Sequence, residues 1–402
     1  MNAIIVDAVR TPRGRGNDKG ALRTIAPAAL LGQPLRALAE RTGVDTATVA
    51  DGIFGCVTQT AEQGSNVGKL GLIAARWSDA VSGLTINRYC ASGLSAVGLA
   101  ALQAEACDGL AVGGGVEMMS RVPMAADRGP LTHDLAFQQQ AGLVPIGIAA
   151  DVVATQRGYS RARCDAFAAQ SQARALAARA AGRFAGIVPV TDAAGAVLLA
   201  ADETPRDGTT VEKLAAMAPA FADWGAKGFD AMLAQRYGLA GVEHVHHAGN
   251  APAMADGAAA VLVGSEAAVR RARLPARARI RATAEAGVDR TLALTGSVDA
   301  ARRAIERAGL AVADIDLFEV NESFAALMLH FQDEMGVGDE RVNVNGGAIA
   351  LGHAMGATGA VLLGMLLDEL ERRGGRFGCV AICGAAGVAS AMVIERLPGA
   401  AA

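Results

Sequence analysis

The sequence predicts an α/β protein made of two similar halves, with a large loop domain inserted between parts of the first. Three observations support this prediction. Short apolar runs typical of buried strands alternate with helical runs, which is the pattern of α/β folds. Prolines and glycines interrupt this order between about residues 120 and 245. A strand–glycine turn–helix–strand unit then occurs once in each half, and each unit has a potential catalytic side chain at its turn.

Composition is that of a large and well-buried protein. A chain of 402 residues usually has two or three domains, and 52% hydrophobic with 19% charged residues excludes a disordered chain. The net charge of −3 gives no electrostatic argument for nucleic acid or membrane binding. We expect no signal peptide and no transmembrane helix. The six cysteines form no C-x-x-C, so we expect reduced thiols in a cytoplasmic protein.

In the first half, strands and helices are expected to alternate strictly. Apolar runs predict strands, and runs with helical spacing that end near glycine or a polar cluster predict helices. The expected strands are 4–8, 52–56, 83–87 and 109–113, and the expected helices are 28–42, 66–75 and 93–106.

The second half is expected to repeat this order after the loop domain. Within the loop domain, runs such as 149–157 and 161–180 have helical spacing, and order returns with the apolar strand 257–264. The expected helices that follow are 298–308, 322–334 and 360–372, and the expected strands are 317–320, 378–383 and 390–396. The predicted domains are therefore residues 1–120 with 246–270, the loop domain 121–245, and residues 271–402.

The densest charge run is Arg270-Arg-Ala-Arg-Leu-Pro-Ala-Arg-Ala-Arg-Ile-Arg281. We interpret it as a solvated connection between the two halves, with a phosphate or partner patch as the alternative.

Cys90 lies in Asn87-Arg-Tyr-Cys-Ala-Ser-Gly93, between a predicted strand and a helix rich in small residues. Unpaired N–H groups and the dipole at a helix amino terminus favour an anion, so a thiolate would be stabilised there. The same N–H groups can receive the oxyanion of a thioester under attack. A small buried core cysteine is the alternative.

His353 lies in a turn rich in glycine, Asn345-Gly-Gly-Ala-Ile-Ala-Leu-Gly-His-Ala-Met-Gly-Ala-Thr-Gly359. Glycines let the backbone approach a ligand closely. A histidine at such a turn before an apolar helix is a candidate base or oxyanion donor, whereas a lone histidine is more often structural. A phosphate loop is disfavoured because the G-x-x-x-x-G-K-[ST] pattern is missing.

Two further segments carry candidate groups. Cys379 and Cys383 share one face of a buried strand, with Cys383 at its tip and no Cys/His pair spaced for a metal. Asn321 follows a strand and opens a predicted helix, where its amide can hold a water or a carbonyl, or simply cap the helix. The only histidine cluster, His244-x-His246-His247, is interpreted as a solvated loop or the edge of a site rather than a metal centre.

Taken together, these motifs resemble the thiolase family over most of the chain. No single motif is specific, but their order and spacing are. The matching segments are Arg10-Thr-Pro, Asn87-Arg-x-Cys90, Gly113-Gly-Gly-Val-Glu-Met-Met-Ser, Ala248-Gly-Asn with Asp256-Gly-Ala-Ala, Asn321-Glu-x-Phe, Gly346-Gly-Ala-Ile-Ala-Leu-Gly-His353 and Cys383.

The resemblance implies a fold and an activity. The fold is the five-layered α-β-α-β-α thiolase arrangement with a loop domain over the CoA site. The activity is reversible CoA-dependent cleavage of 3-ketoacyl-CoA, or the reverse condensation, through an acyl-cysteine. The alternatives are a related condensing enzyme, or a catalytically impaired acyl-CoA-binding relative.

The resemblance also implies roles for individual residues. Cys90 is the expected nucleophile, activated by His353, and Cys383 is the expected second acid/base. One oxyanion pocket is His353 with a water held by Asn321, and the other is the backbone N–H groups of Cys90 and Ala385. The family usually has closely spaced glycines after Cys383, so an alanine at 385 requires a backbone φ that a Cβ tolerates.

Substrate contacts are expected from six residues, namely Ala248, Gly249, Ala293, Phe324, Lys213 and Lys227. Short-chain relatives tend to carry methionine where Ala293 aligns, so we expect a roomier acyl pocket. The lysines are candidates for the CoA phosphates. An extra stretch at about residues 222–246 shapes the acyl tunnel or extends an oligomer contact.

By resemblance, no metal or redox cofactor is required, because CoA and acyl-CoA are substrates. The expected partners are those thioesters and further copies of the chain, as a homodimer or homotetramer. Nucleic acid and membrane are not expected partners.

Overall fold

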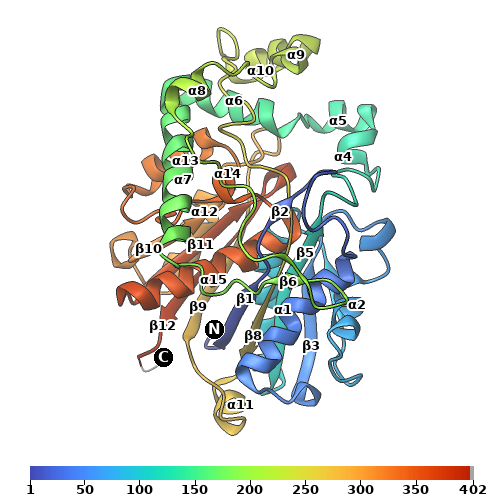
Figure 1. The fold of residues 1–402 in the computed structure, drawn as a ribbon. Coiled ribbons are helices and arrows are strands. Elements are labelled where there is room, and N and C mark those ends of the chain that lie inside the picture. The colour runs from blue at the N-terminus through green and yellow to red at the C-terminus, as the bar shows by residue number, and fades with distance from the viewer. Residues whose placement is uncertain (399–402) are drawn as a thin grey trace.

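The computed structural model describes residues 1–398 and contains one long mixed β-sheet with helices on both faces and between its two halves (Figure 1). The strands follow one hydrogen-bonded order, with β2 (Gly14–Arg15) paired to β8 beside it. That order is β10 (Leu317–Val320), β11 (Phe377–Cys383), β12 (Val388–Arg396), β9 (Ala278–Gly287), β1 (Ile4–Arg10), β8 (Ala255–Gly264), β5 (Leu110–Met118), β3 (Val49–Gly55) and β4 (Leu84–Ile86).

Strand direction divides this sheet into two halves of the same pattern. In the first half β4, β3 and β5 are parallel, and β8 and β1 continue antiparallel. In the second half β10 and β11 are parallel, and β12 and β9 continue antiparallel. β1 and β9 hold equivalent places, and they pair antiparallel at Ile4–Arg279 and Ile5–Ala278. The prediction of two similar α/β halves is confirmed.

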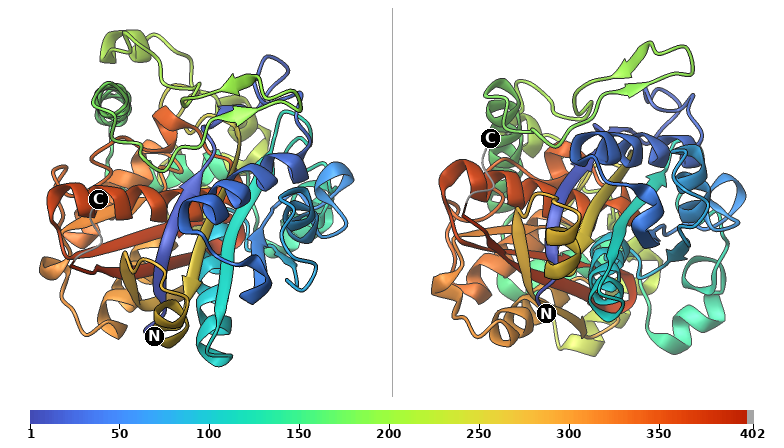
Figure 2. Two further views of the ribbon diagram at one scale, coloured as in Figure 1. Left: turned by 60° about the horizontal axis from the view of Figure 1, so that its bottom comes forward. Right: turned by 90° about the horizontal axis from the view of Figure 1, so that it is seen from below.

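Two helices fill the space between the halves. α3 (Ser92–Ala106) packs on β3 and β5, and α15 (Met355–Arg373) packs on α3, β5, β8 and β11. The outer faces are covered by α1 (Pro27–Thr42) with α2 (Val67–Ala74) on one side, and by α12 (Gly296–Arg307) on the other (Figure 2). Three large clusters of buried apolar residues fill the layers. One lies between the first half of the sheet and α1 with α2, a second lies between the two halves around α3 and α15, and a third lies between the second half of the sheet and α12. The five-layered α-β-α-β-α arrangement is therefore confirmed.

The predicted loop domain, residues 121–245, is mainly helical and extends to the top of the view in Figure 1. Its elements are α4 (Pro130–His133), α5 (Leu135–Ala141), α6 (Ile146–Arg157), α7 (Arg161–Ala180), the hairpin β6 (Val190–Thr191) and β7 (Val197–Leu199), α8 (Val211–Ala215), α9 (Ala222–Trp224), a π-helical turn Gly225–Phe229 and α10 (Asp230–Tyr237). The extra stretch thus forms α9, the π turn and α10. The exact domain boundaries stay a prediction.

The remaining elements connect these layers. The helices are α11 (Glu266–Arg271), α13 (Ala325–Met335) and α14 (Ala348–Leu351), and the 3₁₀ turns are Thr46–Thr48, Ala61–Gln63, Val312–Asp314 and Ala385–Gly387. Local sequence sets many helix ends. α1 begins with Pro27 in its first turn and ends at Gly43, which has a φ of 67°. α7 begins after Ser160, whose side chain caps the N–H of Arg163.

Two sequence predictions need correction. The arginine run is a solvated connection only at its start, because Arg279 and Arg281 lie on β9 between the buried Ala278, Ile280 and Ala282. The many arginines make this segment resemble a charge run, so the alternation of buried and exposed residues that indicates a strand was not recognised. The helix expected at 322–334 begins only at Ala325, because Phe324 is extended with φ −163° and ψ 155°.

Arg277, just before β9, ties the two halves together electrostatically. Its guanidinium pairs with Asp7 of β1 at 2.7 Å and with Asp368 of α15 at 2.8 Å, and it also pairs with Glu371. A buried cation needs such partners, since an unpaired buried charge is strongly destabilising. Within the described residues, none of the helices combines the length and the apolar character that a membrane crossing requires.

Candidate active site

Cys90 lies in a tight turn that leads from β4 into α3. Tyr89, just before it, has a φ of 48°, a conformation that non-glycine residues seldom adopt. Side chains on both sides hold this turn. Asn87 Oδ1 accepts from the Tyr89 N–H at 2.8 Å, and Ser92 Oγ accepts from the Arg88 N–H at 2.8 Å and donates to the Tyr89 carbonyl. The turn presents the Cys90 thiol two residues before the helix begins.

His353 lies in the glycine-rich turn before α15, and its ring orientation is fixed. Gly352 has a φ of 86°, and the His353 N–H donates to the Ala253 carbonyl at 2.8 Å. The ring Nδ1 bonds the hydroxyl of Thr358 at 2.8 Å. Nε2 therefore remains as the nitrogen for proton transfer.

The two turns come together because α3 and α15 touch at glycines near their amino termini. A Cβ on Gly93 would lie 2.6 Å from the Gly356 carbonyl oxygen, so a larger residue would separate the helices. Glu117, fully buried on β5, accepts from the Gly356 N–H at 3.0 Å and from the Val57 N–H at 2.9 Å. Val57 in turn accepts from Asn87 Nδ2 at 3.0 Å. One carboxylate is thus linked to both turns.

Cys383 ends β11 on the other side of the Cys90 turn. A Cβ on the next residue, Gly384, would lie 3.1 Å from the Tyr89 Cβ, so this strand end is packed against the turn. The Cys383 thiol is 2% exposed, and its sulfur lies 3.0 Å from the hydroxyl oxygen of Ser323. Cys379 is buried below it on the same strand, as predicted.

Asn321 lies beside Cys383 and does not cap a helix. Its N–H donates to the Ala381 carbonyl of β11 at 3.0 Å, and its Nδ2 donates to Ser323 Oγ at 3.0 Å. Its Oδ1 is buried and has no partner among the described residues. An unpaired buried oxygen is costly, so this atom is suited to hold a water or a substrate group.

The loop after Cys383 accommodates Ala385 but places Ala386 in the left-handed region, which non-glycine residues seldom adopt. Gly384 is extended with a φ of −135°, and the positive φ values fall on Ala386 (55°) and Gly387 (80°). Ala385, the residue predicted to donate an N–H to the second oxyanion pocket, lies outside the left-handed region. Its Cβ therefore causes no backbone strain.

Electrostatics leave the three candidate groups neutral at rest. Burial raises the pKa of Cys90 well above its usual range, and nearby Cys383 and Glu117 act in the same direction. Burial raises the pKa of Cys383 to about 11. Burial lowers the pKa of His353 to about 4, and Arg13 adds to this effect. Burial thus opposes a Cys90 thiolate, and the stabilisation of that thiolate by the helix terminus stays a prediction.

The predicted substrate residues are spread more widely. Phe324 and Ala293 are buried in one apolar cluster, and Ala293 has a φ of 53°. Gly249 is buried in the loop before β8, whereas Ala248 is exposed. Both lysines are exposed: Lys213 donates to the Gly208 carbonyl at 2.7 Å, and Lys227 lies over the Trp224 ring.

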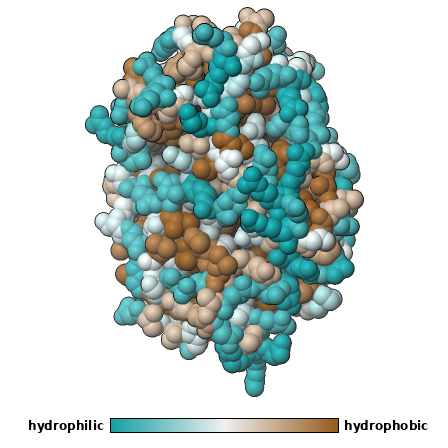
Figure 3. All heavy atoms as spheres, turned by 180° about the vertical axis from the view of Figure 1, so that it is seen from behind, coloured by the Kyte–Doolittle hydropathy of each residue, from teal (hydrophilic) through white to brown (hydrophobic). Residues whose placement is uncertain are grey.

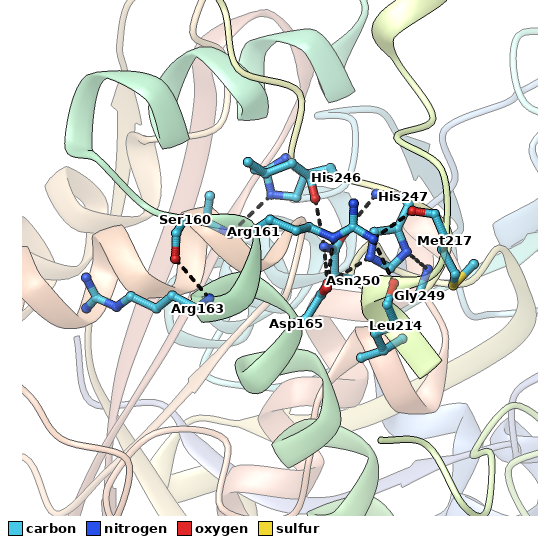
Figure 4. Close-up of polar contacts among 12 residues, drawn as sticks. Ser160, Arg161, Arg163, Asp165, Leu214, Met217, His246, His247, Gly249 and Asn250 are labelled. Carbon is cyan, nitrogen blue, oxygen red and sulfur yellow. Dashed lines mark hydrogen bonds and ion pairs between the residues drawn. The ribbon is translucent and has the colours of Figure 1, made fainter. Parts of the chain in front are cut away.

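His246 and His247 are buried and His244 is half-buried, so the interpretation as a solvated loop is wrong, while the alternative, the edge of a site, stays a prediction. Asp151 of α6 bonds His246 and His244, each at 2.7 Å, and Asp165 of α7 bonds His247 at 2.8 Å. Figure 4 shows the Asp165 part of this network, where Arg161 and Asn250 also reach the carboxylate. These bonds fix the loop that carries Ala248 and Gly249. No group of ligands suited to a metal ion occurs in the part of the chain that the structure describes.

Three residues of this arrangement were missed by sequence reasoning. Thr358 fixes the His353 ring, Ser323 contacts Cys383, and Glu117 links the two turns. The short spacing between His353 and Thr358, which lies one helical turn into α15, was the only sequence signal for this contact. The other two contacts depend on residues that are distant in sequence.

Comparison with known proteins supports this geometry. The family description "Thiolase, N-terminal domain" matches residues 3–227, and "Thiolase, C-terminal domain" matches residues 274–396. The chain is 40% identical to "Beta-ketoadipyl-CoA thiolase" of Pseudomonas aeruginosa, over 98% of each chain. It is 40% identical to "3-ketoacyl-CoA thiolase" of Erwinia tasmaniensis, over 98% of this chain and 99% of that protein. The crystal structure of Bacillus anthracis acetyl-CoA acetyltransferase is similar with a TM-score of 0.84 at 33% identity, covering 98% of this chain and 99% of the other.

The lowered pKa of His353 predicts the pH range of its action as a base. The imidazole is neutral above its pKa, so its capacity to accept a proton is lost only as the pH falls through about 4. We expect single-turnover acylation of Cys90 by acyl-CoA to show no loss between pH 7.5 and 5.5 from histidine protonation. His353→Gln is expected to be slow at every pH. A decline of the parent enzyme centred near pH 6.5 would contradict the assignment.

Proposed function

Because the chain belongs to the thiolase family, we propose that its acyl transfer runs through Cys90, with His353 as base and Cys383 as second acid/base. Membership makes it an acyltransferase that acts on CoA thioesters by thiolytic cleavage or the reverse condensation. The observation that carries the residue assignment is the contact of the turns before α3 and α15 at Gly93 and Gly356, with the tip of β11 packed against the Cys90 turn.

In the first step the Cys90 sulfur attacks the 3-keto carbonyl carbon of the substrate. The thiol proton passes to Nε2 of His353, and the carbonyl electron pair moves onto oxygen. Collapse of this adduct breaks the C2–C3 bond and leaves the acyl group on Cys90. The bond electrons remain on C2 of acetyl-CoA. The pKa directions of both groups support this transfer, since a neutral imidazole and a neutral thiol are the forms that it requires.

Cys383 then completes the cleavage half-reaction. Its S–H proton is transferred to C2, which releases acetyl-CoA and leaves a thiolate. That thiolate takes the proton of incoming CoA, whose sulfur attacks the acyl-Cys90 thioester. The bond between the acyl carbon and the Cys90 sulfur breaks, acyl-CoA leaves, and the Cys90 thiolate takes back the proton that His353 holds. The raised pKa of Cys383 supports a thiol that holds its proton until a carbanion forms.

Two oxyanion pockets are proposed. The first uses His353 with a water held by Asn321, and the unpaired Oδ1 supports it. The second uses the backbone N–H groups of Cys90 and Ala385. The unstrained φ of Ala385 supports this pocket, because an alanine there does not force the N–H away.

We propose that the acyl chain binds against an apolar wall built partly by the extra stretch. The Phe221 and Phe324 rings lie edge to face at 5.9 Å between centroids. Phe229 and Tyr237 of the extra stretch pack with Leu292, next to Ala293. This lining favours an uncharged chain of medium length. The exposed lysines, Lys213 and Lys227, remain candidates for the CoA phosphates.

We propose further that two copies associate through the β4 edge of the sheet. β4 is the end of the strand order, so its outer edge lacks a partner strand among the described residues. Apolar side chains near it are exposed, namely Leu70, Ile73, Leu84, Leu99 and Leu102. Apolar side chains gather in patches on the face turned toward the viewer in Figure 3. A second copy that continues the sheet would cover both features.

Removal of the nucleophile tests the assignment. In the parent enzyme we expect CoA-dependent loss of acetoacetyl-CoA and 3-ketooctanoyl-CoA, and an acyl adduct on the Cys90 peptide by mass spectrometry. Cys90→Ala is expected to lower turnover by about a thousandfold or more. Cys107→Ala, at the exposed end of α3, should leave turnover unchanged. Full activity in Cys90→Ala would exclude the proposed intermediate.

Ala293→Met tests the acyl pocket. A larger side chain would occupy space next to Leu292, so we expect turnover of 3-ketooctanoyl-CoA to fall about tenfold, while acetoacetyl-CoA is cleaved within about twofold of the parent rate. Ala293→Gly suits the positive φ and serves as the control for backbone effects. Unchanged medium-chain activity in Ala293→Met would disprove the pocket assignment.

The double variant Ile73→Asp/Leu102→Asp tests the association surface. Burial of two carboxylates in a dimer interface is unfavourable, so sedimentation velocity should detect monomers. Val197→Asp, an exposed apolar position on the β6–β7 hairpin, is the control and should leave the dimer intact. A double variant that still sediments as a dimer would place the interface elsewhere.

A further inference from the structure

Ser323 contacts the sulfur of Cys383, and the steps proposed above assign it no role. It lies in the loop between β10 and α13 and is 7% exposed. Its hydroxyl oxygen is 3.0 Å from Cys383 Sγ and 3.0 Å from Asn321 Nδ2. The serine therefore lies between the predicted acid/base and the amide of the first oxyanion pocket.

The direction of these hydrogen bonds follows from the donor count. The amide nitrogen of Asn321 can donate a hydrogen bond but cannot accept one, so Nδ2 donates to Ser323 Oγ. A hydroxyl has one proton, and among the described residues Cys383 Sγ is the other atom within hydrogen-bond distance of Oγ. Toward a Cys383 thiolate Ser323 must be the donor, because a thiolate has no proton. Toward the thiol either group can donate, since the hydroxyl oxygen has two lone pairs.

We propose that Ser323 is a positioning residue that prepares Cys383 for proton transfer at carbon. This rests on the proposed role of Cys383 as acid/base. A donated hydrogen bond stabilises the thiolate relative to the thiol. The serine thus raises the acidity of the Cys383 thiol.

The same hydroxyl orients Asn321. Since Nδ2 is bonded to Ser323, Oδ1 is the atom left unpaired. Without the hydroxyl, Asn321 can rotate its amide by 180°, and the acceptor needed for the oxyanion water would be lost. Ser323 therefore couples the acid/base and the first oxyanion pocket.

The proton balance of the step is unaffected by Ser323. In the condensation direction the Cys383 thiolate takes a proton from the methyl carbon of acetyl-CoA. The C–H bond breaks, an S–H bond forms, and the electron pair passes into the enolate. Ser323 keeps its own proton throughout. Burial opposes the thiolate and raises the pKa of Cys383, and the Ser323 hydrogen bond acts against that rise.

The first test is the pH dependence of Cys383 alkylation. The protein carries Cys90→Ala and is labelled with iodoacetamide. Because other thiols also react, the labelling of Cys383 is measured on its own peptide by mass spectrometry. We expect Ser323→Ala to shift the profile upward by about one pH unit, which is about a tenfold lower rate at pH 9. Ser323→Thr keeps the hydroxyl and should restore the parent profile.

The second test measures proton transfer at carbon directly. Deuterium exchange into the methyl group of acetyl-CoA in D₂O should slow about tenfold in Ser323→Ala, and kcat should fall with little change in KM. Ser390→Ala, which removes a buried hydroxyl bonded to Ser95, is the matched control and should stay within about twofold of the parent. Alkylation of Cys90 in Ser323→Ala should also be unchanged, which excludes a general distortion of the site.

The outcomes separate this inference from the proposed function. If Ser323→Ala exchanges deuterium at the parent rate and its Cys383 profile does not move, the inference is wrong while the thiolase mechanism stands. If the parent enzyme neither exchanges deuterium nor acylates Cys90, the proposed function fails first. A shifted Cys383 profile with slowed exchange supports Ser323 as the positioning residue.

Discussion

The close approach of α3 and α15 is the constraint on which the site depends. These helices come from different halves of the chain, and each follows a turn with one reactive side chain. They meet at Gly93 and Gly356, where a Cβ would force the backbones apart. Glu117 accepts N–H groups from the α15 terminus and from the segment that supports the Cys90 turn. Backbone contact at glycine and a buried carboxylate therefore set the distance between the Cys90 turn and the His353 turn.

The resting site carries little charge on its reactive groups. Both thiols keep their protons because they are desolvated, and the imidazole of His353 is neutral for the same reason. Charge then appears only when a substrate is attacked, at atoms that face prepared donors. Such a site avoids a permanent thiolate, which would be open to oxidation and alkylation. Hydrogen bonds from Ser323 and Thr358 fix the surroundings of Cys383 and His353 without a stored charge.

The sequence predicted the order of strands and helices well where local signals agree. The helix over residues 161–180 was predicted to the residue, since Ser160 caps it and its apolar spacing is regular. The strand β9 was missed because arginines occupy its solvent-facing positions. For the site, Cys90 and His353 were found because the motifs around them are local in the sequence. Ser323 and Glu117 were not found, because their contacts join segments that are about 60 to 240 residues apart. Only the folded chain shows such pairs.

The junction of the halves has a consequence for how the protein is made. β1 ends at Arg10, yet its partner strands begin at Ala255 and Ala278. A ribosome that adds about 5–20 residues per second needs about 12–50 s to synthesise the 245 residues that separate Arg10 from Ala255. For that time an apolar strand has emerged without either neighbour. The first strand translated is therefore among the last to find its place, and the nascent chain must be kept from aggregating until its second half arrives.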